Sequence, residues 1–330
     1  MARQQLPTPL GVGDPMPRIT LPLASGGLFD SSDAATSGRT RVYWLGVLTV
    51  AVAAQLADTL MAWEALLHIV AAALPDAQGG YTSWMIDRMG ELPRVFGATG
   101  PLAIVVDAAG RVAALVPDPT PDRVAAEASR LHRQSLPIVV QAQAPVLLLE
   151  RVIEPAFCRS LIDYWRQGEK RANEVGFDGS NVADGEVKRR QDVDLSDAQL
   201  FVQVRDCLGR RVTPAILQAF HAPIAVIEGP RIGCYDASAG GWFRRHRDNT
   251  SRTTAHRQFA LSLNLNADDE YDGGEVRFPE YGRELYRPPA GAALVFSSSL
   301  LHEVIPVIRG RRFGLFTFLS ATAPTARRGP

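Results

Sequence analysis

Two histidines, one aspartate and one arginine constrain how the last third of this 330-residue chain can fold. His246 and Asp248 are two residues apart, so in an extended segment their side chains point the same way and can reach one ion. His302 lies far along the chain and must come from a different strand, and Arg312 follows it by ten residues. Two imidazoles and one carboxylate on one face of a metal leave the opposite face open, which suits ferrous iron. We therefore expect several strands to meet around one metal ion.

The sequence pattern from Ala225 onward supports a β-rich fold. Short apolar runs with period two alternate there with turn signals, as in antiparallel strands. The candidate strands are residues 232–235, 258–265, 274–278, 292–296 and 312–319. Many short antiparallel strands predict a sandwich or barrel, and we expect a double-stranded β-helix, the jelly-roll form. Helices predicted between residues 155 and 220 would cover one outer face of the sheet.

In the order and spacing of these residues, the chain resembles the iron(II)- and 2-oxoglutarate-dependent dioxygenases, specifically the prolyl-4-hydroxylase-like branch. The resemblance covers residues 146–319. Besides the residues above, it includes Tyr235 in a Gly-Cys-Tyr triplet, the run at residues 261–266 and the double glycine Gly273-Gly274. A lone His-x-Asp triplet would be a weak signal, whereas this ordered set is specific.

The resemblance implies that His246, Asp248 and His302 bind Fe(2+), with the co-substrate 2-oxoglutarate at two further positions and oxygen at the third. It assigns the far carboxylate of 2-oxoglutarate to Arg312, because a planar guanidinium can clamp a carboxylate with two parallel hydrogen bonds. Neighbours on a strand point to opposite faces, so the rival residue Arg311 should face away from the site.

Two further residues are expected beside the co-substrate. The resemblance assigns Tyr235 as a hydrogen-bond donor to 2-oxoglutarate, with a satisfied core tyrosine as the alternative. Asn264, on a strand facing the same cavity, is expected to contact the co-substrate as well. The carboxylate of Asp248 favours oxygen insertion over halogenation, because a halogenase of this fold has a small residue there. His256 falls outside the family pattern and is expected to make a hydrogen bond within a loop.

The first third of the chain predicts a separate α/β domain. We expect buried strands at residues 42–47 and 102–106, a helix at residues 54–72, a hairpin strand at residues 111–116 and a helix from residue 121 to about residue 131. This order resembles a thioredoxin or peroxiredoxin domain. No cysteine precedes Cys158, so peroxide reduction, which requires a thiolate, is excluded for this domain. A structural or interaction role remains.

The predicted organisation is a thioredoxin/peroxiredoxin-like domain at residues 1–133, a linker at residues 134–145 and a dioxygenase domain at residues 146–330. Equal numbers of basic and acidic residues, 35 each, give no electrostatic footprint for nucleic acid or an anionic membrane. The most lipid-like stretch, residues 42–57, is shorter than the ~20 residues of a spanning helix. Three sparse cysteines and no signal peptide favour the cytoplasm. The oligomeric state is not predicted.

The predicted function is a dioxygenase that hydroxylates a C–H bond of a peptide, protein or amino-acid-like substrate and releases succinate and CO2. Ascorbate is an optional reductant. The alternative is a non-catalytic, metal-stabilised scaffold whose thioredoxin-like domain recruits a partner. Formation of succinate from 2-oxoglutarate separates these two hypotheses.

A segment rich in Gly, Asn and Asp, residues 173–192, is predicted to be a flap over the site. An ordinary solvated loop is the alternative. Basic and polar residues near this flap and the metal ligands could select a substrate with a carboxylate; they are Lys188, Arg189, Arg190, Arg244, Arg245 and Asn249.

Overall fold

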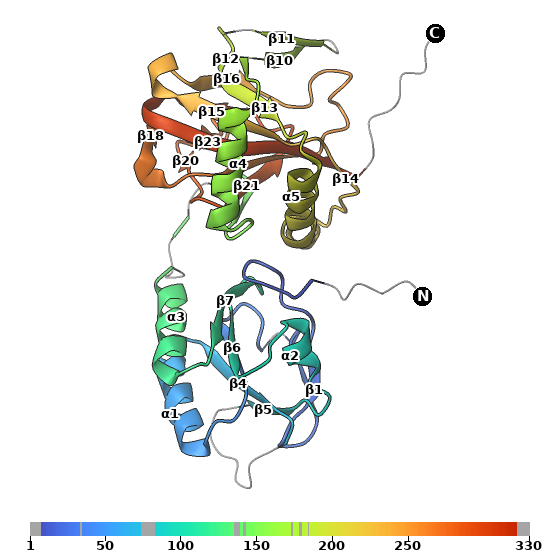
Figure 1. Cartoon of the computed structure of the whole chain (residues 1–330), viewed down its shortest axis with the longest axis vertical. Helices are drawn as coiled ribbons and strands as arrows, with labels where there is room; N and C mark the ends of the chain where they lie inside the picture. Colours follow the sequence, from blue (N-terminus) through green and yellow to red (C-terminus); the bar gives the residue numbers. More distant parts are fainter. Residues whose placement is uncertain are drawn as a thin grey trace, which may run out of the picture. The chain divides into compact units, whose positions relative to one another are not determined.

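The computed structural model describes residues 8–33, 35–73, 83–134, 139–140, 143–172, 174–177, 180–183 and 185–321. The chain divides into two compact units, Met1–Val139 and Val140–Pro330, whose elements are labelled in Figure 1. Each unit has buried apolar clusters of its own. Half of the predicted linker, residues 135–138 and 141–142, lies outside the described residues.

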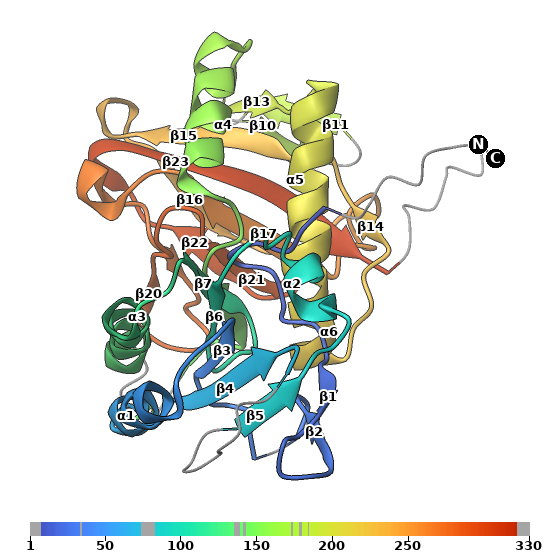
Figure 2. The same ribbon diagram turned by 60° about the horizontal axis from the view of Figure 1, so that its bottom comes forward.

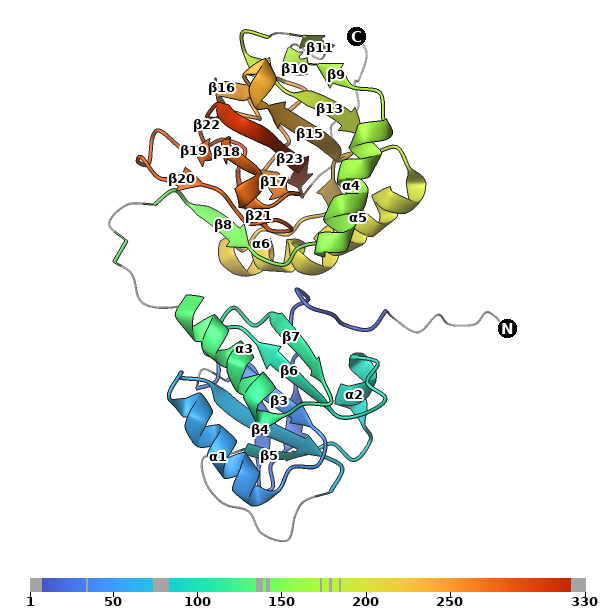
Figure 3. The same ribbon diagram turned by 60° about the vertical axis from the view of Figure 1, so that its left-hand side comes forward.

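A five-stranded mixed sheet forms the centre of the first unit, in the order β5-β4-β3-β6-β7. Its strands are β3 (Arg41–Leu45), β4 (Leu66–Ala71), β5 (Ser83–Ile86), β6 (Leu102–Val106) and β7 (Val112–Pro117), and a separate hairpin joins β1 (Thr20–Pro22) to β2 (Leu28–Asp30). Strands β3, β4 and β5 pair in parallel, whereas β6 and β7 are antiparallel. Helices α1 (Val50–Met61) and α3 (Pro121–Gln134) pack on one face, and α2 (Glu91–Val95) packs on the other (Figure 3).

The helix predicted at residues 54–72 is wrong beyond Met61. Helix α1 begins earlier, after Thr49, whose side chain accepts a hydrogen bond from the backbone of Val52 and caps the helix. Residues Leu66–Ala71 instead form β4, which has a parallel neighbour on each side. A strand in this position is buried on both faces, so apolar and polar residues do not alternate along it. Its apolar run was therefore mistaken for a continuation of the preceding helix.

Two antiparallel sheets form the second unit, as expected for a jelly roll. The larger has the order β8-β21-β17-β23-β15-β13-β9, with β14 and β18 also paired to β23, and Figure 2 shows several of these strands side by side. Its strands are β8 (Val146–Leu149), β9 (Arg171–Ala172), β13 (Gln191–Asp194), β14 (Val226–Ile227), β15 (Arg231–Asp236), β17 (Phe259–Asn264), β18 (Tyr271–Gly273), β21 (Ala293–Ser297) and β23 (Val307–Ser320).

The smaller sheet of the second unit has the order β12-β16-β22-β19-β20. Its strands are β12 (Lys188–Arg189), β16 (Trp242–His246), β19 (Val276–Arg277), β20 (Leu285–Tyr286) and β22 (His302–Val304). Apolar side chains from both sheets form one cluster between them, including Tyr235 and Phe296 from the larger sheet and Val276 and Val304 from the smaller. The unit is therefore a sandwich with a shared core.

Three helices cover the outer face of the larger sheet, as predicted (Figure 3). They are α4 (Pro155–Gln167), α5 (Ala198–Arg211) and α6 (Thr213–Phe220). Leu161, Leu208 and Ile216 from these helices are fully buried in one cluster with Ile232 and Leu315 from the sheet. The helical conformation is interrupted between α5 and α6. A proline occupies the first turn of α6, a position that tolerates the missing N–H.

The segment predicted as a flap, residues 173–192, forms strands in its described parts. Strands β10 (Glu174–Phe177) and β11 (Ser180–Ala183) pair as a hairpin, β12 pairs with β16, and β13 pairs with β15. Residues 173, 178–179 and 184 lie outside the described residues. Lys188 and Arg190 are buried, so the solvated-loop alternative is wrong for them. Local composition could not reveal this, because the pairing partners come from distant sequence.

The three cysteines are free thiols, two of them buried. Burial raises the pKa of Cys158 to about 11 and that of Cys234 to about 12, so neither is a ready thiolate at neutral pH. Across the residues that the structure describes, no helix is both long enough and apolar enough to span a bilayer.

His68 gives the first unit a pH-dependent stability. Its ring is buried on β4, stacks on Tyr43 with a centroid distance of 5.1 Å, and has no hydrogen-bond partner at either nitrogen among the described residues. Burial, followed by the nearby charge of Arg41, lowers the pKa of His68 to about 3. The unfolded chain, with an ordinary histidine pKa near 6.5, binds the proton more readily than the folded chain.

We therefore expect the stabilising contribution of a neutral His68 to be complete above pH ~6.5 and to be lost as pH falls from there toward ~3. Between pH 7 and pH 5, His68 should account for a loss of about 2 kcal/mol in the free energy of unfolding of the first unit. The variant His68→Phe should lack this component, as urea unfolding at both pH values would show. An equal loss in the variant and the wild type would contradict the assignment.

Candidate active site

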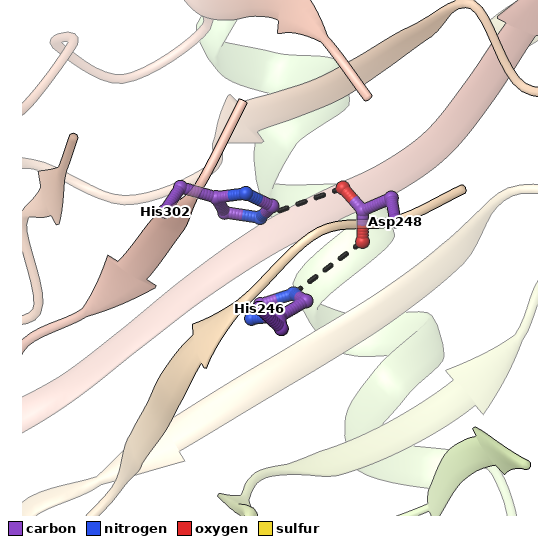
Figure 4. A group of neighbouring side chains, drawn as sticks. All are labelled: His246, Asp248 and His302. Carbon is purple, nitrogen blue, oxygen red and sulfur yellow. Dashed lines mark ion pairs between the residues drawn. The ribbon is translucent and has the colours of Figure 1, made fainter. Parts of the chain in front are cut away.

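The predicted metal ligands meet between β16 and β22. His246 lies directly opposite His302 in this antiparallel pair, and Asp248 follows β16 by two residues, held by a 2.9 Å hydrogen bond from its backbone N–H to the carbonyl of Ser298. The Nε2 atom of each histidine lies 3.4 Å from one carboxylate oxygen of Asp248 (Figure 4). One potential ligand atom from each of the three residues lies within 4.8 Å of the others.

Hydrogen bonds to the backbone fix the orientation of both rings. The Nδ1 atom of His246 lies 2.7 Å from the carbonyl oxygen of Arg244, and that of His302 lies 3.0 Å from the carbonyl oxygen of Leu300. A carbonyl can only accept, so each Nδ1 carries a proton, and each Nε2 is the ring nitrogen directed at Asp248. Adjacent ligands on a first-row metal are about 3 Å apart, given bonds of about 2.1 Å. The three donors therefore fit a metal ion.

The protonation states also suit a cation. Burial lowers the pKa of His302 to about 4, so the ring is neutral near pH 7. Burial acts to raise the pKa of Asp248, but His302 and His246 outweigh it, and the pKa of this carboxyl lies below its usual value. The neutral ring of His302 and the ionised carboxylate of Asp248 suit the binding of a cation. Among the described residues, this is the one group of three such side chains close enough to hold a metal.

The three residues open onto a cavity of about 610 Å³. Aromatic and aliphatic side chains form part of its wall, including Phe243, whose ring stacks on His246 with centroids 3.7 Å apart. The charged part of the wall is mainly cationic: Lys188, Arg190, Arg231, Arg247 and Arg257 line it beside the carboxylates of Glu228 and Asp248. A cavity of this size, with both apolar and polar side chains in its wall, can hold a small molecule or a side chain.

Arg312 lies behind the wall of the cavity and is 1% exposed. Its guanidinium donates to the carbonyl of Gly274 at 2.7 Å, to the hydroxyl of Ser262 at 3.1 Å and to the side-chain oxygen of Asn264 at 3.3 Å. No carboxylate pairs with it in the described parts of the chain. Arg311 is exposed and pairs with Asp236 instead, so the predicted orientation of the two arginines is confirmed.

The double glycine provides the space for Arg312. Gly274 has φ of +74°, which favours glycine, and a Cβ at this position would lie 3.0 Å from Cδ of Arg312 and 2.8 Å from a methyl carbon of Val307. A side chain here would push against the buried guanidinium. Gly274, the second residue of the double glycine, therefore provides the space that the arginine occupies.

The two other predicted residues have different positions. Tyr235 lines the cavity, lies opposite Arg312 on the neighbouring strand, and its hydroxyl accepts a 3.2 Å hydrogen bond from Arg190. Asn264 is not on the cavity wall; its amide nitrogen donates to the hydroxyl of Tyr271 at 2.8 Å while its oxygen receives Arg312. This geometry gives Asn264 a positioning role, and its direct contact with a co-substrate stays a prediction.

Only some of the basic and polar residues expected at the mouth of the pocket line the cavity. Lys188 and Arg190 line the cavity, but Arg189, Arg244, Arg245 and Asn249 do not. The last three have partners elsewhere: Glu186, Glu303 and Ser299, respectively. His256 pairs with Glu228 at 3.0 Å, which agrees with the hydrogen bond expected of it.

Sequence reasoning missed Arg231, Arg257 and Glu228 on the cavity wall. A signal for Arg231 was available. It precedes Tyr235 by four residues on the same strand, and period-two alternation sends both side chains to the same face.

Comparisons with known proteins agree with this geometry. Residues 231–320 match the family model described as 2OG-Fe(II) oxygenase superfamily. A PKHD-type hydroxylase from Cupriavidus metallidurans is 31% identical over 157 residues, which cover 42% of this chain and 68% of the relative. A PKHD-type hydroxylase from Synechococcus sp. is 33% identical over 95 residues, which cover 27% of this chain and 42% of the relative. The chain thus spans less than half the length of this second relative.

Solved structures include two similar proteins of low identity. A prolyl-4-hydroxylase from Pseudomonas putida has a TM-score of 0.42 and 20% identity, and the match covers 55% of this chain and 95% of that one. A prolyl hydroxylase from Trichoplax adhaerens, solved with a peptide fragment of hypoxia inducible factor, has a TM-score of 0.46 and 14% identity, covering 54% and 84% of the two chains.

Replacing Asp248 with alanine should remove the anionic member of the centre and weaken the binding of ferrous iron. Removing a residue that only supports a metal ligand typically lowers metal affinity about 10–100-fold, and we expect the loss of iron affinity in Asp248→Ala to be larger. Anaerobic calorimetry with ferrous iron would measure it. The matched control is Asp272→Ala, which removes an exposed carboxylate paired with Arg309 and should leave the affinity unchanged. Equal affinities in the two variants would contradict the assignment.

Proposed function

The chain belongs to the 2OG-Fe(II) oxygenase superfamily, and from this premise we propose that it is a 2-oxoglutarate-dependent hydroxylase. In this reaction 2-oxoglutarate loses CO2 and becomes succinate, one oxygen atom of O2 enters succinate, and the other enters a C–H bond of the substrate. The observation that carries the proposal is the convergence of His246, Asp248 and His302 on the wall of a cavity with Arg312 behind it.

Ferrous iron and 2-oxoglutarate, when bound, supply the oxidising chemistry, and ascorbate is an optional reductant. The protein would hold the metal through the two Nε2 atoms and the carboxylate. Hydrogen bonds between Nδ1 and backbone carbonyls maintain the orientation of both rings. Phe243 packs flat on His246, and Phe296 lies 4.7 Å from the ring of His302. These aromatic rings restrict ring movement and keep water away from one side of the ligands.

Arg312 is the proposed clamp for the far carboxylate of 2-oxoglutarate. A buried guanidinium with only neutral acceptors is costly, and a carboxylate would supply the missing countercharge with two parallel hydrogen bonds. Tyr235, opposite Arg312, already receives a hydrogen bond from Arg190, so its own proton is available to donate to the co-substrate. Asn264 would hold the clamp in place.

The proposed substrate is a peptide, a protein or an amino-acid-like molecule. The relatives named as hydroxylases and the size of the cavity support this class. Equal numbers of basic and acidic residues are consistent with the proposal that neither nucleic acid nor a membrane is a partner, and three free thiols are consistent with a cytoplasmic protein.

The first unit is proposed to be a thioredoxin-like module with a structural or docking role. A parallel strand-helix-strand unit, β3-α1-β4, is followed by the antiparallel pair β6-β7 and by α3, and this order supports the assignment. Residues 1–157 contain no cysteine, so thiol chemistry is not part of the proposed role.

Purified protein supplied with ferrous iron, oxygen and 2-oxoglutarate should form succinate, measured by mass spectrometry. His302→Ala should abolish this product because the metal loses a ligand. The control His221→Ala changes an exposed histidine at the end of α6 and should form succinate like the wild type. Absence of succinate from the wild type, with iron bound, would favour the non-catalytic scaffold.

The clamp is tested by a matched pair of neighbours. Arg312→Lys keeps the charge but loses the fork, so the 2-oxoglutarate concentration for half-maximal succinate formation should rise about tenfold or more, the cost of one lost charge-assisted hydrogen bond. Arg311→Lys makes the same change at an exposed position and should leave this concentration unchanged. Iron affinity should be similar in both. An unaltered requirement in Arg312→Lys would refute the role.

A further inference from the structure

Arg231 differs from the other arginines on the cavity wall because its side chain has no partner. It is half-buried, and within the described parts of the chain no hydrogen bond or ion pair reaches its guanidinium. By contrast, Arg257 makes two hydrogen bonds of 2.8 Å to Glu228, and Arg247 pairs with Glu280 at 2.6 Å. A guanidinium on a partly apolar wall is therefore left without a countercharge.

The nearest candidates for an internal partner are already engaged. Asp194 lies directly opposite Arg231 on β13, but its carboxylate pairs with Arg171 at 2.7 Å. Glu228, three residues before Arg231 on the same wall, receives both Arg257 and His256. Neither carboxylate is free to neutralise Arg231.

A second cation without a carboxylate of its own lies nearby. Lys188 donates to Asp192 at 2.9 Å, but Arg190 makes two hydrogen bonds to the same carboxylate, at 2.6 and 2.9 Å. Lys188, Arg190 and Asp192 are all buried, and both cations contact this one carboxylate away from bulk water. Burial first, then the charges of Arg190 and Arg231, lower the pKa of Lys188 to about 8, which indicates that Arg231 lies close enough to repel it.

Gly233 explains how these groups come together. A Cβ on Gly233 would lie 2.6 Å from the Asp192 carboxylate and 2.8 Å from Cδ of Arg190, so this ion pair rests directly on the glycine backbone. Arg231 precedes Gly233 by two residues and Tyr235 follows it by two, which places all three on one face of β15. Arg231 and Tyr235 are therefore about 13 Å apart along the strand, on opposite sides of the ion pair.

This spacing separates two anion-binding positions. Tyr235 lies opposite Arg312, the proposed clamp for 2-oxoglutarate, so the co-substrate belongs to that end of β15. Arg231 lies at the other end, on the same cavity as the metal ligands. An anion held by Arg231 would thus be distinct from the far carboxylate of 2-oxoglutarate.

We propose that Arg231, assisted by Lys188, binds a carboxylate of the primary substrate and thereby selects acidic substrates or substrates with a free carboxyl terminus. This inference rests on the proposed function and names a substrate class for the same cavity. The guanidinium supplies a planar fork for the carboxylate, and the partial burial of Arg231 strengthens the pairing relative to open solvent. Arg231 would be a specificity-determining residue, without a part in the oxidation itself.

The experiment measures binding rather than turnover. The full chain, loaded anaerobically with ferrous iron and 2-oxoglutarate, is titrated in a calorimeter with two sets of probes. The first set pairs free α-amino acids with their α-amides. The second pairs the capped peptide acetyl-Gly-Glu-Gly-amide with its glutamine counterpart. The two sets distinguish a terminal carboxylate from an acidic side chain as the source of the charge.

In at least one set, the acid should bind about tenfold or more tightly than its neutral counterpart, the effect of one charge-assisted hydrogen bond. Arg231→Gln should abolish this preference, and Arg231→Lys should retain part of it because the charge remains. The matched control is Arg189→Gln, which removes an exposed cation on β12 outside the cavity wall and should keep the full preference.

Equal binding of acids and neutral counterparts in both sets, including no binding by either, would overturn the proposal. So would a preference that Arg231→Gln and Arg189→Gln retain to the same degree, since Arg231 would then be a solvated arginine. The outcome is separable from that of the proposed function. Succinate formation without a charge preference would refute only the carboxylate site, whereas a charge preference without succinate would refute only the hydroxylase.

Discussion

The antiparallel pairing of β16 with β22 is the interaction on which the site depends. It places His246 opposite His302, and the chain then turns so that Asp248 is held by Ser298 within reach of both rings. A shift of β22 by one residue would send His302 to the other face of its sheet and leave two ligands without a third. The register is supported by the apolar cluster between the two sheets, to which Val304 contributes from β22 itself. The same strand register therefore determines both the packing of the core and the geometry of the metal ligands.

In the second unit, the charged side chains around the proposed metal centre are mostly opposite in sign to Asp248. Asp248 gives the proposed metal centre a negative charge, while most of the other charged side chains on the cavity wall are cations. Two glycines make room for buried cations of this unit, Gly274 for Arg312 behind the cavity wall and Gly233 for the pair of Arg190 with Asp192. Since unpaired buried charge is costly, the arrangement favours bound anions at two separate positions. A cofactor anion and a substrate anion would satisfy it without competing for the same arginine.

Local pattern predicted much of the fold but failed where burial or pairing overrode it. Period-two runs placed β15, β17 and β21 near their observed bounds, and helices were expected between residues 155 and 220, where α4, α5 and α6 lie. The helix predicted through residue 72 ran into β4, because a strand buried on both faces shows no alternation. The segment at residues 173–192 has the composition of a loop, yet β12 and β13 within it pair with β16 and β15. Those partners lie some 40 to 60 residues away, beyond any local signal.

By itself, the sequence determined the chemistry available: two histidines and an aspartate spaced for one metal, an arginine ten residues on, and a first unit without a cysteine. The family resemblance assigned Arg312 to the interior, and strand alternation then predicted that Arg311 would point the other way. Only the tertiary structure decided that Asn264 supports Arg312, that Lys188 and Arg190 share Asp192, and that Arg231 has no partner among the described residues. Whether a charge is paired depends on which distant strands become neighbours, and spacing along the chain does not contain that information.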